Sequence, residues 1–399
     1  MTSRTFALGG YGPRPRSAWD RLTARDSVVW RMDWIILLAG VALAIIGSLL
    51  VYSATRNRTE LNQGDPRYFL VRHVISLGIG IALMIGTVWL GHRRLRSAVP
   101  VLYGLTVLLA LCVLTPLGAT INGSRAWLNL GGGFTVQPAE FIKITVILGM
   151  AMLLAAKVDA GDQDHPDHRT VLHALGMAAL PIAVILAMPD LGSVMVLVVI
   201  VLAVLLASGA SNRWVIGLCL AGAGGAVLVW ALGLLDEYQI NRFAAFANPA
   251  LDPAGVGYNT NQARIAIGSG GLTGKGLFEG TQTTGQFVPE QQTDFVFTVA
   301  GEELGFVGGG LILVLLGVLI WRACRIARES TELYSTIVAA GVIAWFAFQA
   351  FENIGMTLGI MPVAGLPLPF VSYGGTSMFA VWIAVGLLQS IRTQRPIAA

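Results

Sequence analysis

A cluster of carboxylates stands where a long polar stretch meets an apolar run late in the chain. Glu290 and Asp294 come directly before this run, and Glu302 and Glu303 lie inside it. Carboxylates at the edge of a membrane are costly unless they are paired, hydrated or used in chemistry. One such carboxylate could take a proton from an attacking hydroxyl group, as a general base does. The plainer interpretation of Asp294 is a helix cap, because aspartate is common at helix N-termini.

A second cluster opens an earlier apolar run. Pro138 suits the first position of a helix, and Glu140 would then lie in the first turn. Glu140 and Lys143 are three residues apart, so they share one face of that helix. They could form a local ion pair, but Lys143 would lie one turn inside the membrane, where an idle charge is expensive.

Further cations and glycines accompany these clusters. Arg125 and Trp127 precede the second cluster, and Lys275 lies near the end of the glycine-rich stretch 261–276. Backbone N–H groups in glycine turns can cradle phosphate oxygens, although Gly276 stands where a Walker A motif requires Ser or Thr. A tight turn after a short amphipathic helix is the alternative. Together the clusters suit a substrate with a phosphate head and a lipid tail.

The elements that must position these residues are membrane-spanning helices. The chain of 399 residues is 55% hydrophobic and 12% charged, which is about half the charge of a soluble domain. A spanning helix needs about 20 apolar residues. The sequence therefore predicts an all-α polytopic membrane protein with about ten transmembrane helices, at Trp34–Tyr52, Val74–Leu90, Val99–Leu117, Pro138–Ala156, Val171–Met188, Gly192–Ala207, Val215–Leu235, Phe295–Trp321, Thr336–Leu358 and Gly375–Ile391.

Basic residues set the predicted orientation, because cytoplasmic loops are rich in Lys and Arg. An N-terminus in the cytoplasm puts most loop Lys and Arg residues inside, most clearly in the short loops Gly91–Ala98 and Arg322–Ser330. We therefore expect both termini in the cytoplasm. A loop as long as the one before helix eight favours a functional role. The predicted domains are a basic tail at 1–32, a membrane domain at 33–392 with a large extracytoplasmic loop at 236–294 between helices seven and eight, and a second tail at 393–399.

Other classes of function are disfavoured by composition. Three cysteines without a CxxC pair and five histidines near segment ends predict neither a disulfide framework nor a metal site. Nothing in the charge distribution suggests a nucleic-acid partner. The N-terminal tail lacks an apolar core, so we expect no cleavable signal peptide.

The motifs resemble a known family. From about Trp34 to Ile391 the chain is similar to the SEDS (shape, elongation, division and sporulation) proteins. Within the family, the stretch Gly359–Gly375 is more similar to the elongation members (RodA) than to the division members (FtsW). The resemblance rests on G-S-R-A-W-L (Gly123–Leu128), Q-P-A-E-F-I-K (Gln137–Lys143), P-D-L-G-S (Pro189–Ser193), I-G-S-G-G-L-T-G-K-G (Ile267–Gly276), P-E-Q-Q-T-D-F (Pro289–Phe295), G-E-E-L-G-F (Gly301–Phe306) and N-I-G-M (Asn353–Met356).

This resemblance implies an activity and a site. SEDS proteins are ten-helix membrane glycosyltransferases that polymerise lipid II into peptidoglycan. The essential aspartate of the family falls on Asp294, which implies that Asp294 is the catalytic base. We expect cationic side chains to face the diphosphate of the substrate. The predicted substrate-binding residues are Arg125, Trp127, Glu140, Lys143, Lys275 and Glu303.

The resemblance also implies partners. These are lipid II, a class B penicillin-binding protein that crosslinks the new glycan, other membrane proteins of the elongation complex, and membrane lipid. A divalent cation, magnesium or manganese, is compatible with the family, but no metal motif in the sequence identifies one. The chain departs from the family pattern at Ala139, Arg264 and Thr376, and Arg264 could add a phosphate contact.

Two other functions suit charged groups within a helical bundle. A lipid II flippase or transporter would carry ionisable residues along its whole path, whereas the residues here gather at the predicted outer end. A scaffold that only recruits crosslinking enzymes would leave Lys143 and Asp294 unexplained. Within the family, a role in division or sporulation is the alternative to elongation.

Overall fold

The structure is a computed structural model of the chain, which describes residues 28–121, 124–131, 134–188, 190–233, 246 and 255–394. The predicted tails at 1–32 and 393–399 lie mostly outside the described residues. The same holds for the first part of the predicted loop at 236–294.

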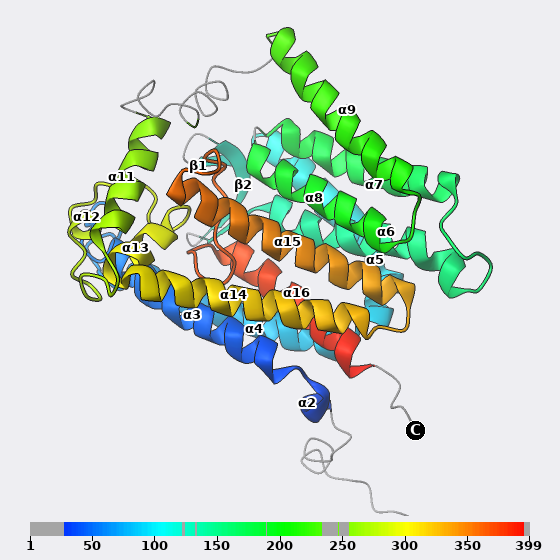
Figure 1. Cartoon of the computed structure of the whole chain (residues 1–399), viewed down its shortest axis with the longest axis horizontal. Helices are drawn as coiled ribbons and strands as arrows, with labels where there is room; N and C mark the ends of the chain where they lie inside the picture. Colours follow the sequence, from blue (N-terminus) through cyan, green and yellow to red (C-terminus); the bar gives the residue numbers. More distant parts are fainter. Residues whose placement is uncertain are drawn as a thin grey trace, which may run out of the picture.

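A bundle of helices forms the body of the molecule (Figure 1). Within the described residues, eight helices are long and apolar enough to cross a membrane, and α8 is a shorter apolar helix. Every apolar segment predicted from the sequence overlaps a helix, which confirms the all-α membrane fold. The helices of the bundle are α3 (Trp34–Thr55), α4 (Tyr68–Leu90), α5 (His92–Leu114), α6 (Pro138–Asp159), α7 (His168–Leu186), α8 (Leu191–Ala207), α9 (Asn212–Ala231), α14 (Gly305–Arg328), α15 (Leu333–Leu358) and α16 (Gly375–Thr393).

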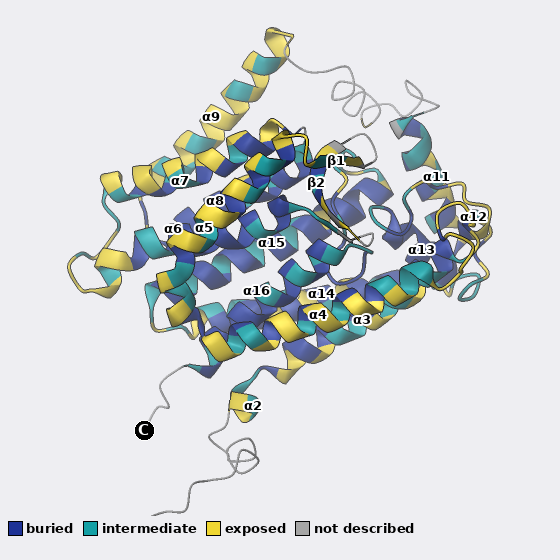
Figure 2. Cartoon of the chain, turned by 180° about the vertical axis from the view of Figure 1, so that it is seen from behind, coloured by how far each residue is buried: buried dark blue, intermediate teal, exposed yellow. Residues whose placement is uncertain are grey.

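Helices α6 and α15 lie at the centre of the bundle. Buried residues occur along nearly the whole length of both, as expected for helices that are apolar on most faces. Trp345 of α15 and Trp382 of α16 are among the largest fully buried side chains. Helix α9 is the opposite case, because none of its residues is buried and its C-terminal end projects away from the bundle (Figures 1 and 2).

The helix predicted at Phe295–Trp321 is broken in two, so the prediction of one continuous span is wrong. α13 (Val296–Glu303) ends before Leu304, and α14 begins at Gly305. Gly305 has a φ of +65°, in the region that favours glycine. A Cβ at this position would also lie 2.3 Å from the backbone nitrogen of Gly274, so a neighbouring segment packs directly against the break.

That neighbouring segment is the glycine-rich stretch 270–276, and it satisfies the backbone groups that the break leaves. The N–H groups of Lys275 and Gly276 donate to the last carbonyls of α13, over 3.0 and 3.1 Å. Two carbonyls of the segment accept from the first turn of α14, over 2.9 and 3.1 Å. A Cβ at Gly274 would lie 2.1 Å from the Glu303 carbonyl oxygen, so this approach requires glycine. The tight-turn interpretation is confirmed here. The N–H groups of Lys275 and Gly276 donate to protein carbonyls.

A small antiparallel sheet, which the sequence analysis did not predict, precedes α6. Its strands pair in the order β1-β2-β3, with Leu128 opposite Val136. Thr376, at the start of α16, ties this sheet to α6. Its hydroxyl donates to the carbonyl of Thr135 and accepts from the N–H of Gln137, each over 3.2 Å. The strands are β1 (Gly118–Ile121), β2 (Ser124–Gly131) and β3 (Phe134–Val136).

The two ends of the bundle differ in character. At the end we call the terminal end, Asp33 binds Arg322 through both carboxylate oxygens, and Gln389 bonds the backbone of Asp33. There α5 begins at His92, so most of the loop predicted at Gly91–Ala98 is helical. The opposite end, which we call the site end, holds the sheet and the residues of interest. It also holds α11 (Val256–Ser269), α12 (Thr281–Thr284), α13 and the loop at 359–374.

Candidate functional site

Asp294 lies at the site end, immediately before the N-cap residue of α13. That N-cap is Phe295, which makes no side-chain cap bond, so Asp294 lies one residue before the N-cap position that the helix-cap interpretation gave it. The N–H groups of Thr293, Asp294 and Phe295 all donate to the carbonyl of Glu290, at 3.1 to 3.2 Å. This compact turn leaves Asp294 half-buried. The carboxylate therefore sits on a rigid turn and not inside a helix.

The loop at 359–374 packs against the turn that carries Asp294. The hydroxyl of Ser372 donates to the carbonyl of Thr293 over 2.5 Å, and the N–H of Tyr373 donates to the carbonyl of Gln292 over 2.8 Å. Burial raises the pKa of the Tyr373 hydroxyl, so this ring stays neutral beside the turn. Two consecutive loop residues thus hold the two residues that precede Asp294.

Asn353 of α15 holds Asp294 from another side. Its Nδ2 atom donates to the carbonyl of Asp294 over 2.8 Å and to the carbonyl of Leu366 over 2.7 Å. Gly365 comes close to the carboxylate, since a Cβ built there would lie 3.4 Å from Oδ2 of Asp294. Gly365 also has a φ of +72°, so any other residue would be strained.

Arg58 supports the segment that leads to Asp294 and was not singled out from the sequence. Its buried guanidinium donates to the carbonyl of Val288 over 2.7 Å and to Oε1 of Gln291 over 3.4 Å. Burial lowers the pKa of Arg58, while the nearby charge of Glu290 raises it. Arginine stays protonated under both influences, so Arg58 is a fixed positive charge behind the turn.

Lys143 and Glu140 form the ion pair that their spacing predicted. Nζ of Lys143 lies 2.8 Å from Oε1 of Glu140 and 3.1 Å from Oε1 of Gln349, and it lies 4.8 Å from the ring centroid of Trp345. The Lys143 side chain is 0% exposed and that of Glu140 is 2% exposed. Neither group reaches the surface, so a phosphate contact would require α6 and α15 to separate.

Lys275 and Glu303 brace the break between α13 and α14. Nζ of Lys275 lies 2.9 Å from Oε1 of Glu302 and 2.7 Å from the hydroxyl of Thr281. Glu303 accepts from the hydroxyl of Ser53 over 2.5 Å and from the N–H of Phe278 over 3.0 Å. Lys275 therefore has structural partners on α12 and α13, and Glu303 has them on α3 and on the loop after α11.

Arg125 and Trp127 lie on β2. Arg125 is exposed, and its guanidinium donates to the carbonyl of Thr115 at the end of α5. Trp127 is half-buried opposite Ala119 on β1. Arg264 donates to the last two carbonyls at the end of α15, over 3.2 and 3.0 Å, where a cation also suits the helix dipole.

The predicted site residues therefore fall into three groups. Asp294 and the Lys143 pair are linked through α15, Lys275 and Glu303 sit at the helix break, and Arg125 and Trp127 sit on the sheet. Sequence reasoning missed Gln349, which contacts both Lys143 and the loop at 359–374. The sequence offered only a weak signal for Gln349, which is a single neutral amide one turn before Asn353 in an apolar helix.

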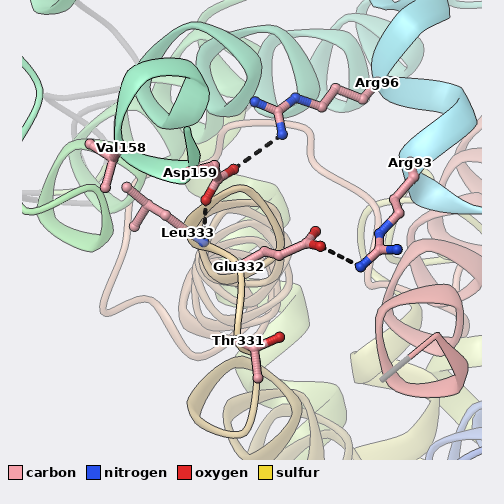
Figure 3. A pocket seen from close by; sticks show the side chains of 7 residues that line it. All are labelled: Arg93, Arg96, Val158, Asp159, Thr331, Glu332 and Leu333. Carbon is pink, nitrogen blue, oxygen red and sulfur yellow. Dashed lines mark hydrogen bonds and ion pairs between the residues drawn. The ribbon is translucent and has the colours of Figure 1, made fainter. Parts of the chain in front are cut away.

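A cavity of about 480 Å³ lies at the terminal end, away from these groups. Figure 3 shows its charged lining, in which Arg93 pairs with Glu332 and Arg96 pairs with Asp159 over 3.1 Å. Asp159 also accepts from the N–H of Leu333 over 2.9 Å. Because these charges neutralise one another, the cavity offers no unbalanced group to attract a ligand among its lining residues.

Known proteins are similar to this chain in sequence and in fold. A family model of cell cycle proteins covering FtsW, RodA and SpoVE matches residues 33–396. Stage V sporulation protein E of Bacillus subtilis is 36% identical over 90% of this chain and 96% of its own. Peptidoglycan glycosyltransferase MrdB of Escherichia coli K12 is 33% identical over 96% of this chain and 97% of its own. A chain from a solved peptidoglycan synthase complex that coordinates polymerization and crosslinking has a TM-score of 0.73 and 30% identity, covering 90% of this chain and 97% of its own.

Proposed function

Since the chain belongs to the SEDS family of cell cycle proteins, which includes FtsW, RodA and SpoVE, we propose that it is a peptidoglycan glycosyltransferase that polymerises lipid II. A relative named as a peptidoglycan glycosyltransferase supports the activity. The related structure of a synthase complex supports a crosslinking partner, which we take to be a class B penicillin-binding protein. The RodA-like stretch Gly359–Gly375 favours a role in cell elongation over division.

We assign the site end to the outer face of the cytoplasmic membrane and both termini to the cytoplasm. Arginines of α5 and α14 gather at the terminal end, as the excess of positive charge in cytoplasmic loops requires. A site at the outer face would meet lipid II in the outer leaflet. The exposed apolar surface of α9 would face lipid.

In the proposed reaction Asp294 is the general base. Its carboxylate accepts the proton of the 4-hydroxyl of the acceptor GlcNAc, and that oxygen attacks the anomeric carbon of the donor MurNAc. The bond from this carbon to undecaprenyl diphosphate breaks, and the diphosphate leaves with the electron pair. A single displacement converts the α-linkage into a β-linkage, which needs a base and no covalent intermediate.

The observation that carries this proposal is the setting of Asp294. The carboxylate is half-buried, it adjoins Gly365, and its backbone is held by Asn353 and the Glu290 turn. A general base must be held within hydrogen-bond reach of the hydroxyl that it deprotonates. A turn bonded on several sides is suited to that requirement.

Lys143, Arg125 and Lys275 are the cations that were expected to face the leaving diphosphate. Of the predicted cations we assign this contact to Arg125, because its guanidinium is exposed whereas Lys143 is enclosed. Glu140 and Lys143 then act behind the site, and Lys275 and Glu303 support the loop beside it. Among the described residues no three His, Cys, Asp or Glu side chains gather as metal ligands would, so no step is assigned to magnesium or manganese.

The test is polymerisation of lipid II by the purified chain with its partner penicillin-binding protein, comparing wild type with Asp294→Asn. We expect glycan strands from wild type and a loss of about 10²–10⁴-fold in the variant, the usual contribution of a general base. The matched control is Asp167→Asn. Asp167 is a true helix cap, which accepts from the N–H of Thr170 over 2.9 Å at the terminal end.

The control should polymerise at the wild-type rate. Equal activity in Asp294→Asn and wild type, at equal protein levels, would refute the base assignment. If neither protein makes glycan while wild type moves lipid II across vesicle membranes, the flippase alternative is correct and the proposed polymerase is not.

A further inference from the structure

A line of buried polar side chains runs along one face of α15 toward Asp294. Trp345, Gln349 and Asn353 follow one another at intervals of four residues, so they stack on one face of the helix. All three are fully buried. Amides in the interior of a membrane bundle are costly unless they are hydrogen-bonded, so the partners of these side chains are informative.

Gln349 joins the buried ion pair to the loop at 359–374. Its Oε1 atom accepts from Nζ of Lys143 over 3.1 Å and from Nε1 of Trp345 over 2.7 Å. Its Nε2 atom donates to the carbonyl of Pro367 over 2.7 Å. Two donors on one side and a carbonyl on the other fix the orientation of this amide.

Asn353 continues the line by one helical turn. Its Nδ2 atom holds the carbonyls of Leu366 and Asp294, over 2.7 and 2.8 Å. Gln349 and Asn353 thus hold the adjacent carbonyls of Pro367 and Leu366. The same Nδ2 atom of Asn353 also donates to the carbonyl of Asp294. The loop residue before Leu366 is Gly365, at which a Cβ would lie 3.4 Å from Oδ2 of Asp294.

We propose that Gln349 and Asn353 are positioning residues, which set the place of Asp294 relative to the Lys143–Glu140 pair. This inference rests on the proposed function, in which Asp294 is the base. Both amides are neutral, so they restrain the turn without adding a charge beside the carboxylate. Their removal should act through geometry, and a shift of about 1 Å at a reacting group can cost about 10²-fold in rate.

The experiment compares Asn353→Ala and Gln349→Ala with Gln389→Ala in lipid II polymerisation with the partner protein. Gln389 is the matched control, because it is a fully buried amide that bonds backbone groups at the terminal end. We expect Asn353→Ala to lower kcat about 10- to 100-fold and to leave KM for lipid II within about 3-fold. Gln349→Ala, one step further away, should lower kcat less. Gln389→Ala should lower Tm comparably and leave kcat within about 2-fold of wild type.

Hydrogen exchange gives a readout that does not depend on activity. Asn353→Ala should speed amide exchange in peptides covering 288–296 and 362–373, and Gln389→Ala should not. If Asn353→Ala expresses poorly, Asn353→Leu keeps a similar volume, adds no charge and donates no hydrogen bond, so the same changes are expected.

Two results would overturn the positioning role. One is a wild-type kcat in Asn353→Ala, and the other is unchanged exchange at 288–296. The proposed function fails by a different result, namely full activity in Asp294→Asn. In that case the exchange data still decide whether the two amides hold the turn.

Discussion

Two lysine–glutamate pairs at the site end look alike in distance and in the burial of their carboxylates, but they differ in the exposure of the lysine and in their other partners. Lys143 and Glu140 approach to 2.8 Å, and Lys275 and Glu302 approach to 2.9 Å. The Lys143 side chain is 0% exposed, whereas that of Lys275 is 27% exposed. The separation of the charges therefore says little about what each pair does.

The carboxylates are the clearest difference. Glu302 is saturated: its oxygens accept from Lys275, from Thr281 and from the backbone or hydroxyl groups of Gln282 and Thr283, at 2.8 to 3.3 Å. Within the described part of the chain, Oε2 of Glu140 has no hydrogen-bond partner. A saturated carboxylate is typical of a structural brace, and a buried carboxylate that is half satisfied is costly to maintain.

The pairs also differ in what they join. Lys275 and Glu302 tie a loop to the broken end of α13, close to their own segments. Lys143 bridges from α6 to Gln349 of α15, and Gln349 reaches the loop beside Asp294. The comparison therefore assigns one pair to folding of the loop and the other to the placement of the proposed base.

The largest effect is expected for Lys143→Met. It leaves the Glu140 carboxylate buried without its cation, which costs about 3–5 kcal/mol of folding free energy. The double variant Lys143→Met/Glu140→Met removes both charges and should recover most of that stability. Thermal unfolding in detergent measures both changes. We expect lipid II polymerisation to stay at least about 10-fold below wild type in the double variant, because the support of Gln349 is lost. A double variant as active as wild type would show that this pair is as purely structural as the other.

A smaller effect is expected for Glu302→Gln. The amide nitrogen would face hydrogen-bond donors, which costs about 1–3 kcal/mol, and amide exchange in peptides covering 275–283 should rise. Activity should fall only as far as the folded fraction falls. The matched control is Glu329→Gln. Glu329 is an exposed glutamate paired with Arg325 at the terminal end, so a loss of folding free energy of about 0.5 kcal/mol or less is expected. A loss of activity in Glu302→Gln without loss of stability would move this pair into the active site.

Much of the fold could be predicted because a membrane restricts what a chain can do. Apolar length alone identifies helices when every backbone group must be satisfied internally. The break at Leu304 and Gly305 was not predicted in this way, because apolar residues resume directly after Glu302 and Glu303 and the whole stretch was taken as one span. Its partner, the segment 270–276, lies far upstream and joins it only in three dimensions. The small sheet was missed because its strands are short, from three to eight residues.

The site could be predicted where a charge stands alone in apolar surroundings. Lys143 was singled out in that way, and the local spacing predicted its pair with Glu140 correctly. Asp294 was singled out differently, from a cluster of carboxylates and from the family resemblance, and its role stays a prediction. The ion pair of Lys275 was not predictable, since Glu302 lies 27 residues away. Gln349 carries no charge and gave almost no signal in the sequence. In the structure its amide bonds Lys143, Trp345 and the carbonyl of Pro367.

The smallest effect is expected for Lys275→Met, and it sharpens the comparison most directly. Glu302 keeps its bonds to Gln282 and Thr283, and Lys275 is partly exposed to solvent. We therefore expect the free energy of unfolding to fall by about 0.5–1.5 kcal/mol. Polymerisation should stay within about 3-fold of wild type, with KM for lipid II unchanged. Steady-state kinetics over a range of lipid II concentrations measure this. A tenfold rise in KM at constant stability would mean that Lys275 leaves Glu302 to bind the diphosphate, and then the resemblance between the two pairs would be functional after all.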